Sequence, residues 1–276
     1  MQHELDTTEH HRQRSEFIRK LVQRPISQSR ISNLYMPPAP KTIVQFWHDL
    51  GELPSDVEEC VRSWIVWKRR GFEHRLFDQH TAAAFISSLL GSRHRRAFDR
   101  CYHPAMQADY FRLCYVLVEG GFYVDADDVC VSTGAYGLVQ DGRLKLQPLC
   151  YDLATQTMVK PSAFLLPGAC DQSWIFYFNN NPLIASPRNP VIEHALEEAT
   201  SLLELAGEDE LPEIQIATGP GNISKSIFDL GIDSGFDIEN NVVVLGDWDS
   251  IAISKWPLSY RDDARNWRLS NQKRFQ

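Results

Sequence analysis

Apolar positions along this chain switch between the spacing of helices and that of strands. Segments in which apolar residues recur every three or four positions are typical of amphipathic helices. Shorter runs rich in β-branched and aromatic residues are typical of buried strands. The pattern predicts helices over 54–69, 80–100, 108–118 and 191–205, and strands over 42–47, 72–77, 122–124 and 242–245. Such an order of elements indicates an α/β chain.

The N-terminal part of the chain differs from the rest. Residues 1–24 are polar and helix-prone, with one apolar stripe that includes Phe17 and Ile18. We expect a helix packed on the surface of the domain, and an arm that binds an acceptor or a partner is the alternative. The proline-rich segment 36–40 is a stiff connector that cannot be helical. We therefore expect a helical arm with its connector over 1–37 and a single larger domain over 38–276.

Three aspartates, Asp125, Asp127 and Asp128, follow the predicted strand over 122–124. In open α/β sheets, ligands bind outside the carboxyl ends of strands. Two carboxylates separated by a single residue at such an end form an oxygen site suited to Mg²⁺ or Mn²⁺. An ion held there could bind a diphosphate. A bare D-x-D also occurs where acidic residues merely start a turn, so the surrounding pattern has to decide.

The helix before that strand carries a second polar pair. Asp109 and Arg112 are three residues apart and therefore share one face of the helix. Gly120 and Gly121 end the helix, because glycine tolerates the left-handed geometry that closes a helix end.

Composition and charge narrow the range of partners. With 276 residues, of which 43% are hydrophobic, the chain can bury a sizeable core. Its net charge of −8 argues against a general nucleic-acid binder. No window approaches the roughly 20 apolar residues that span a membrane, and no signal-peptide core follows the polar N-terminus. We expect no transmembrane segment and a cytoplasmic location.

A longer pattern surrounds the D-x-D and carries a family resemblance. The chain has A-x-D-x-x-R from Ala108, then an apolar helix, then G-G-F-Y-x-D-x-D from Gly120. This pattern resembles the DXD sugar-binding region of family-32 glycosyltransferases, which are related to the catalytic core of the large clostridial glucosylating toxins. Weaker similarities at 40–47, 179–190 and 217–221 and in the tail extend it over roughly residues 38–268. The resemblance implies a GT-A-type domain over 38–276, with a mostly parallel central sheet flanked by helices and a tail that closes over the site.

The resemblance also implies a role for each matching residue. Asp127 would ligate Mn²⁺ or Mg²⁺ directly, and Asp125 would hold the ribose and a metal-bound water. Asp109 would bond sugar or ribose hydroxyls, and Arg112 would contact the sugar or phosphate. The other residues of the implied donor site are Trp47 against the base, Tyr123, Asn180 or its neighbour Asn179 facing the sugar, the loop at Gly219, and Trp267 over the diphosphate.

The chain departs from the family pattern in two places. Val44 stands where the family usually has histidine, and the tail lacks the histidine and serine of the family's H-x-x-x-x-S-W. Arg261 or Asp262 lies near the histidine position. Either Asp262 contacts the metal in its place, or this site is altered. Of the two tail tryptophans, we expect Trp267 to form the lid. Trp256 follows an apolar run and is expected to be a packed residue.

The function implied is a retaining, metal-dependent transfer of a sugar from a UDP- or GDP-sugar to an acceptor hydroxyl. The acceptor would be a glycan, a lipid-linked sugar or a protein, and polysaccharide biosynthesis is one setting for it. A phosphatase of the haloacid-dehalogenase type is an alternative, with Asp125 as nucleophile, Asp127 as acid and base, and 246–249 as the distal acidic motif. However, that motif normally lies near the start of its domain. A non-catalytic nucleotide-sugar-binding module is the other alternative.

Overall fold

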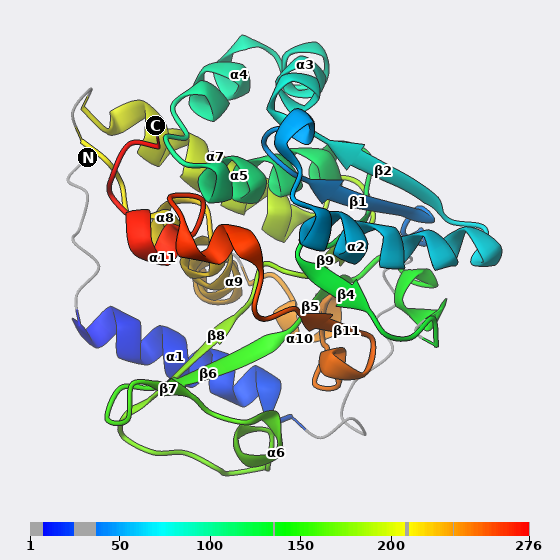
Figure 1. The fold of residues 1–276 in the computed structure, drawn as a ribbon. Coiled ribbons are helices and arrows are strands. Elements are labelled where there is room, and N and C mark those ends of the chain that lie inside the picture. Colours follow the sequence, from blue (N-terminus) through cyan, green and yellow to red (C-terminus); the bar gives the residue numbers. More distant parts are fainter. Residues whose placement is uncertain (1–7, 25–36, 135, 208–209, 234, 276) are drawn as a thin grey trace.

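The computed structural model describes residues 8–24, 37–134, 136–207, 210–233 and 235–275. Its central sheet has six strands, in the spatial order β10 (Val242–Val244), β5 (Leu144–Leu146), β9 (Leu183–Ala185), β3 (Gly121–Tyr123), β1 (Thr42–Phe46) and β2 (Glu73–Phe77) (Figure 1). Strand β9 is antiparallel to both of its neighbours, and the other neighbouring strands pair in parallel. The expected α/β fold with a mostly parallel central sheet is confirmed.

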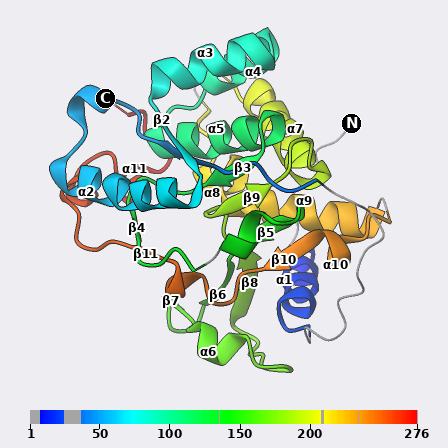
Figure 2. The same cartoon turned by 90° about the vertical axis from the view of Figure 1, so that its right-hand side faces the viewer.

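The central sheet is buried on both faces, because its side chains alternate between two cores. In β3, Phe122 faces one core and Tyr123 the other, and Ile43 and Val44 of β1 divide in the same way. The core on the Val44 side holds α5 (Pro104–Val118) and α7 (Pro190–Leu205), which lie side by side in Figure 2. The core on the Ile43 side holds three tryptophans from two short 3₁₀ helices, η3 (Trp64–Arg70) and η5 (Trp248–Ser250), namely Trp64, Trp67 and Trp248.

A second, three-stranded sheet has the order β7 (Thr157–Met158), β6 (Pro148–Asp152) and β8 (Trp174–Phe178). Helix α1 (Thr8–Val22) lies against β8 (Figure 1), and α9 (Pro220–Asp233) packs on it as well. Two serines of these helices, Ser15 and Ser224, accept hydrogen bonds from backbone N–H groups of β8 at 2.9 Å. These bonds satisfy donors that the strand would otherwise leave unpaired. Ile18 of α1 is fully buried in the main core, so this helix is an integral part of the packed structure.

The remaining elements frame the edge of the central sheet. A two-stranded antiparallel sheet joins β4 (Asp128–Cys130) to β11 (Ala252–Ser254) and so ties the segment after β3 to the C-terminal tail. Within the described ranges, no helix has both the length and the apolar character needed to cross a bilayer. The other helices are η2 (Leu50–Glu52), α2 (Ser55–Ser63), α3 (Gln79–Leu89), α4 (Ser92–Asp99), η4 (Tyr136–Val139), α6 (Pro161–Phe164), α8 (Ile214–Ala217), α10 (Ile238–Asn241), η6 (Ser259–Asp262) and α11 (Trp267–Ser270).

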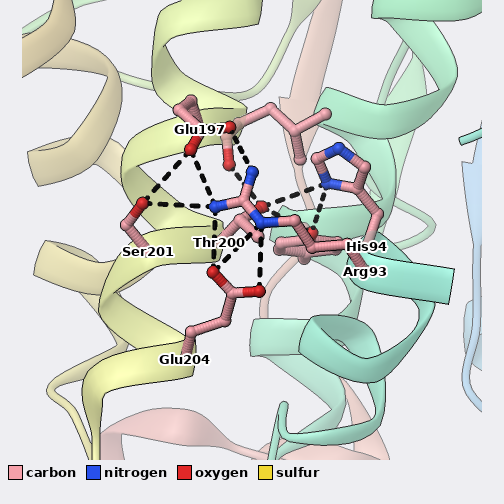
Figure 3. A network of polar contacts seen from close by, with 8 residues as sticks. Arg93, His94, Glu197, Thr200, Ser201 and Glu204 are labelled. Atoms are coloured by element: carbon pink, nitrogen blue, oxygen red, sulfur yellow. Dashed lines mark hydrogen bonds and ion pairs between the residues drawn. The ribbon is translucent and has the colours of Figure 1, made fainter. Parts of the chain in front are cut away.

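An exposed arginine fastens α4 to α7. Arg93 pairs with Glu197 at 2.7 Å and with Glu204 at 2.9 Å, and all three side chains are at least one-third exposed (Figure 3). Beside it, His94 Nδ1 lies 3.2 Å from Thr200 Oγ1 of α7. Arg93 therefore links the two helices through a pair of solvent-exposed ion pairs.

Three predicted elements differ from the structure. The predicted helix over 54–69 changes to a 3₁₀ helix at Trp64, and the one over 80–100 divides at Gly91, whose φ of +83° is left-handed. The expected loop at 217–221 ends early, since α9 begins at Pro220, and the apolar pattern had not revealed this helix. Proline is well suited to a first helical position, because its missing N–H would have no partner there.

Candidate active site

The D-x-D carboxylates lie where β1 and β3 end side by side. After Tyr123 the chain turns, and Asp128 N–H donates to Asp125 O at 3.2 Å. The side chain of Gln45 in β1 donates to the same carbonyl at 3.1 Å. The turn therefore holds Asp125 and Asp127 at the carboxyl edge of the sheet, the edge at which open α/β sheets bind ligands.

Arg112 of α5 is the buried centre of this site. Its Nη2 lies 2.8 Å from Asp125 Oδ1 and 2.9 Å from Asp109 Oδ1, and its Nη1 donates to Asn180 O at 2.9 Å. Its guanidinium carbon lies 4.5 Å from the centre of the Tyr123 ring. One rigid guanidinium thus joins a helix, the end of β3 and the segment before β9.

Burial shapes the electrostatics of this cluster. Burial raises the pKa of Asp109 even though Arg112 and the Asn180 amide favour its charged form. The pKa of Asp125 is raised for the same main reason, and the nearby Asp127 charge adds to the effect. Burial opposes the charge of Arg112 as well, but its carboxylate neighbours outweigh burial and hold its pKa above the ordinary value. The carboxylates therefore lie where additional positive charge would stabilise their ionised forms.

Asn181 and Asp128 are site residues that the sequence patterns did not single out for a role. Asn181 Oδ1 accepts from Asp125 N at 3.0 Å, and its Nδ2 donates to Asp128 Oδ2 at 2.9 Å. Asp128 is buried, and burial together with Asp127 and Asp125 raises its pKa well above the usual range. The three consecutive asparagines at 179–181 were the available signal, but only the fold shows that the third one holds the D-x-D turn.

The C-terminal tail reaches the second carboxylate of the motif. Tyr260 Oη donates to Asp127 Oδ2 at 2.7 Å, and Arg261 Nη2 forms a close ion pair with the same oxygen. The guanidinium carbon of Arg261 lies 3.8 Å from the centre of the Trp256 ring. Asp127 is therefore held from the tail, whereas Asp125 is held from α5.

A cavity of about 470 Å³ opens over these groups. Its volume is within the range of small-molecule sites. Acidic, basic, amide and aromatic side chains line it together. They include Trp47, Asp109, Arg112, Asp125, Asp127, Asp128, Asn179, Asn180, Trp256, Tyr260, Arg261, Arg265, Trp267 and Arg268.

The structure gathers most of the expected site residues in this cavity, but not all of them. Tyr123 is fully buried beneath Arg112 and does not line the cavity. Gly219 lies behind Asp109, and a Cβ at this glycine would come within 3.2 Å of Asp109 Oδ2. Asp262 is exposed and does not line the cavity, while its neighbour Arg261 contacts Asp127. Arg261, and not Asp262, therefore lies next to the D-x-D in this structure.

The tryptophans differ from expectation in one case. Trp256 is 57% exposed and lines the cavity, so it is not the packed residue that its apolar neighbours suggested. Trp267 is half-buried, packs against the edge of the main core and also lines the cavity. Trp47 directly follows the carboxyl end of β1 and lines the cavity. It packs edge-on against Tyr260, with ring centres 5.2 Å apart.

The carboxylate oxygens of the site suit a divalent cation that is bound partly by the protein and partly by the phosphates of a ligand. Among the described residues, no group of three or more histidine, cysteine, aspartate and glutamate side chains is placed to hold a metal ion. Mg²⁺ usually needs no such cage, because it keeps several waters and binds one or two carboxylates together with substrate phosphates. Asp125 and Asp127 offer those carboxylates. Burial, together with the neighbouring carboxylate charges, raises the pKa of Asp125 and of Asp128, and a bound cation would oppose that shift. The residues therefore fit an ion such as Mg²⁺ or Mn²⁺.

Comparisons with known proteins found one matching family model and similar solved structures. Residues 54–137 match the family model described as "Glycosyltransferase sugar-binding region containing DXD motif". Among solved structures, a chain titled "PaToxG Glycosyltransferase" aligns over 93% of this chain and 92% of its own, with 14% sequence identity and a TM-score of 0.47. No curated protein matches the sequence.

The matched region contains α5, both glycines after it and the whole D-x-D turn, which are the elements that build the cavity. The match favours a sugar-binding D-x-D over the phosphatase motif considered for the same residues. The mixed α/β sheet is consistent with a GT-A-type fold. Over residues 54–137, the chain is therefore similar to the DXD sugar-binding region of glycosyltransferases.

Proposed function

We propose that this protein transfers a sugar from a nucleotide-sugar, a UDP- or GDP-sugar, to an acceptor hydroxyl. The observation that carries the proposal is the position of Asp125 and Asp127. They lie at the carboxyl end of β3, inside a cavity that also contains buried Arg112. A nucleotide-sugar needs a charged site for its diphosphate, polar groups for its sugar and an apolar surface for its base, and the cavity lining offers all three.

Asp127 and Asp125 would hold the divalent ion, Mn²⁺ or Mg²⁺. Bound there, the ion would act as a Lewis acid for the nucleoside diphosphate leaving group. Arg112 would keep Asp125 in place through its 2.8 Å contact, so that the carboxylate stays oriented during the reaction. This division of labour gives the buried arginine a positioning role in addition to any contact with the donor.

The sugar would lie near Asp109 and Asn180. The Asn180 amide donates to Asp109 Oδ1 at 2.8 Å, and a sugar hydroxyl would donate to the same carboxylate. Trp47 would contact the base at the end of β1. Trp267 would cover the diphosphate and exclude water, which limits hydrolysis of the donor. Retention of configuration at the transferred carbon follows from the family resemblance, and an NMR assignment of the product anomer tests it.

We also propose that residues 38–276 form the catalytic domain and that 1–37 form an arm, of which 1–7 and 25–36 lie outside the described residues. Helix α1 within that arm packs on β8 and places Ile18 in the main core, which supports a structural role for its described part. The acceptor would be a glycan, a lipid-linked sugar or a protein hydroxyl.

A thermal-shift panel of UDP- and GDP-sugars, each with and without Mn²⁺, tests the proposal. A ligand that binds only the folded state raises stability by about 2.7 kcal/mol at one hundred times its dissociation constant. We expect one nucleotide-sugar to raise the melting temperature in the presence of Mn²⁺. We expect no such rise for Asp127→Ala, which serves as the matched control. A panel without any shift, together with a phosphoenzyme trapped at Asp125 by a phosphate mimic, would instead establish the phosphatase.

A further inference from the structure

We propose that the C-terminal tail carries a diphosphate subsite made by Arg261 and Arg268. We further propose that, when the divalent ion binds, Arg261 leaves its ion pair with Asp127 and pairs with the diphosphate instead. The proposal rests on the proposed function, since it concerns the leaving group of a nucleotide-sugar. Arg261 and Arg268 would supply positive charge in the part of the tail where the family's histidine is missing.

Arg261 is a buried cation with unused hydrogen-bonding capacity. It is 9% exposed and lines the cavity. Its Nη2 pairs with Asp127 Oδ2 and lies 3.4 Å from Ser254 Oγ. Its Nε is buried and has no hydrogen-bond partner among the described residues. A buried N–H without a partner is costly, so this donor favours an incoming acceptor.

The tail holds Arg261 in place from several sides. Its guanidinium stacks on Trp256, and its backbone carbonyl accepts from Asn266 Nδ2 at 2.6 Å. Its backbone N–H donates to Leu258 O at 3.0 Å. Because its backbone is hydrogen-bonded on both sides and its guanidinium stacks on a ring, the guanidinium plane is pre-organised. A planar fork of this kind matches the oxygens of a phosphate.

Arg268 supplies a second cation on the same wall. It lines the cavity, and its guanidinium carbon lies 4.8 Å from the centre of the Trp267 ring. In the described part of the chain it forms no ion pair with a carboxylate. Arg265, which lies between the two, differs because Asp263 holds it through contacts of 2.6 Å and 3.1 Å. The tail therefore leaves Arg268 available for a mobile anion.

The exchange follows from a shared oxygen. Arg261 and Tyr260 both bond Asp127 Oδ2, which belongs to the carboxylate proposed to ligate the ion. An ion bound to Asp127 competes with Arg261 for that carboxylate. The diphosphate offers the displaced guanidinium new oxygens nearby. Arg261 thus keeps Asp127 paired in the free protein and binds the donor in the loaded one.

Two binding measurements on Arg261→Met test this inference. Calorimetry with Mn²⁺ alone reports on the competition for Asp127, and calorimetry with UDP at saturating Mn²⁺ reports on the diphosphate subsite. We expect the variant to bind Mn²⁺ more tightly than the wild-type protein, because its competitor is gone. We expect it to bind UDP about tenfold to a hundredfold more weakly, because charge-assisted hydrogen bonds are lost.

Arg261→Lys and Arg93→Met complete the design. Lysine keeps the charge but lacks the planar fork and the Nε donor, so Arg261→Lys should bind Mn²⁺ like the wild type and UDP more weakly. Arg93→Met removes the same charge from a site outside the cavity and should change neither affinity. This pair of variants keeps the test informative if Arg261→Met does not fold.

The results that would overturn the inference differ from those that would overturn the proposed function. Unchanged UDP binding in Arg261→Met, or weaker binding of Mn²⁺ alone, overturns the inference while the glycosyltransferase proposal stands. A wild-type protein that binds neither UDP nor GDP with Mn²⁺ overturns the proposed function and this inference with it.

Discussion

Removing Arg112 should destabilise the protein far more than removing an exposed arginine with the same kind of partners. Arg112 is 4% exposed at its side chain and pairs with Asp109 and Asp125 at 2.9 Å and 2.8 Å. Arg112→Met fills a similar volume but leaves the buried Asp109 and the half-buried Asp125 without their cation. Breaking a buried pair in this way costs about 3–5 kcal/mol, because the remaining charge is desolvated and uncompensated.

The chain offers a matched control at Arg93. This arginine pairs with Glu197 and Glu204 at 2.7 Å and 2.9 Å, distances like those around Arg112, but its side chain is 40% exposed. Water screens such pairs, and their contribution is about 1 kcal/mol or less. Arg93→Met should therefore lower the free energy of unfolding much less than Arg112→Met. Distance alone would predict equal losses, whereas burial predicts unequal ones.

Urea denaturation in the presence of a chelator measures both losses. For a protein of this size, about 3–5 kcal/mol corresponds to a fall in melting temperature of roughly 6–20 °C. Arg112→Lys should lie between the wild type and Arg112→Met, because lysine keeps the charge but cannot bridge both carboxylates with a planar fork.

The pH dependence gives the loss a second signature. Arg112 favours the charged forms of Asp109 and Asp125, so its removal raises the pKa of both carboxylates further. A folded-state pKa above the unfolded value adds stability at low pH, and that stability is lost as pH rises through the folded pKa. The difference between wild type and Arg112→Met should therefore be larger at pH 8 than near pH 5. Equal losses for Arg112→Met and Arg93→Met, or a loss that grows as pH falls, would refute this reasoning.

Three further predictions concern the metal pair, the turn before the site and the tail. Asp127→Ala should abolish Mn²⁺-dependent donor binding in calorimetry, and undiminished binding would remove Asp127 from the metal site. Gly120→Ala should lower the free energy of unfolding by about 2–4 kcal/mol in urea denaturation, because φ is +68° and the new Cβ would lie 2.6 Å from Pro187 Cδ. Gly71→Ala is the control. Its φ is +80° but the space around it is open, so it should cost only about 1–2 kcal/mol. Trp267→Ala should lower turnover while far-ultraviolet circular dichroism stays native, and full turnover would exclude this residue as a lid.

Much of the site could be predicted because its residues are close in sequence. Asp109 and Arg112 are one helical turn apart, and Gly120 and Gly121 fix where the helix ends and the strand begins. A short strand then determines that Asp125 emerges at its carboxyl end. Local geometry of this kind depends on helix period and glycine conformation, both of which the sequence displays.

The tail contacts could not be predicted, because they depend on the phase of a short helix far along the chain. Arg261 and Asp262 are consecutive residues of η6, and in a 3₁₀ helix consecutive side chains point about 120° apart. Nothing in the local pattern says which of them faces the cavity. In the structure Arg261 is buried against Asp127, while Asp262 is exposed.

The role of Trp256 was obscured by a misleading pattern. Of the apolar residues before it, Ala252 and Ile253 belong to β11, which in the described part of the chain pairs with β4 in a two-stranded sheet. Ala252 is buried, but Ile253 is 51% exposed, so the burial of this run ends before the tryptophan. The exposed ring instead stacks on Arg261.

The central claim is that the D-x-D cavity binds a nucleotide-sugar and breaks its glycosidic bond. Release of nucleoside diphosphate from UDP- and GDP-sugars, with Mn²⁺ and without any acceptor, tests it most directly, with Asp127→Ala assayed in parallel. We expect slow hydrolysis of at least one donor by the wild-type protein and none by the variant. Equal release by both proteins, or binding of a donor without any release, would contradict it.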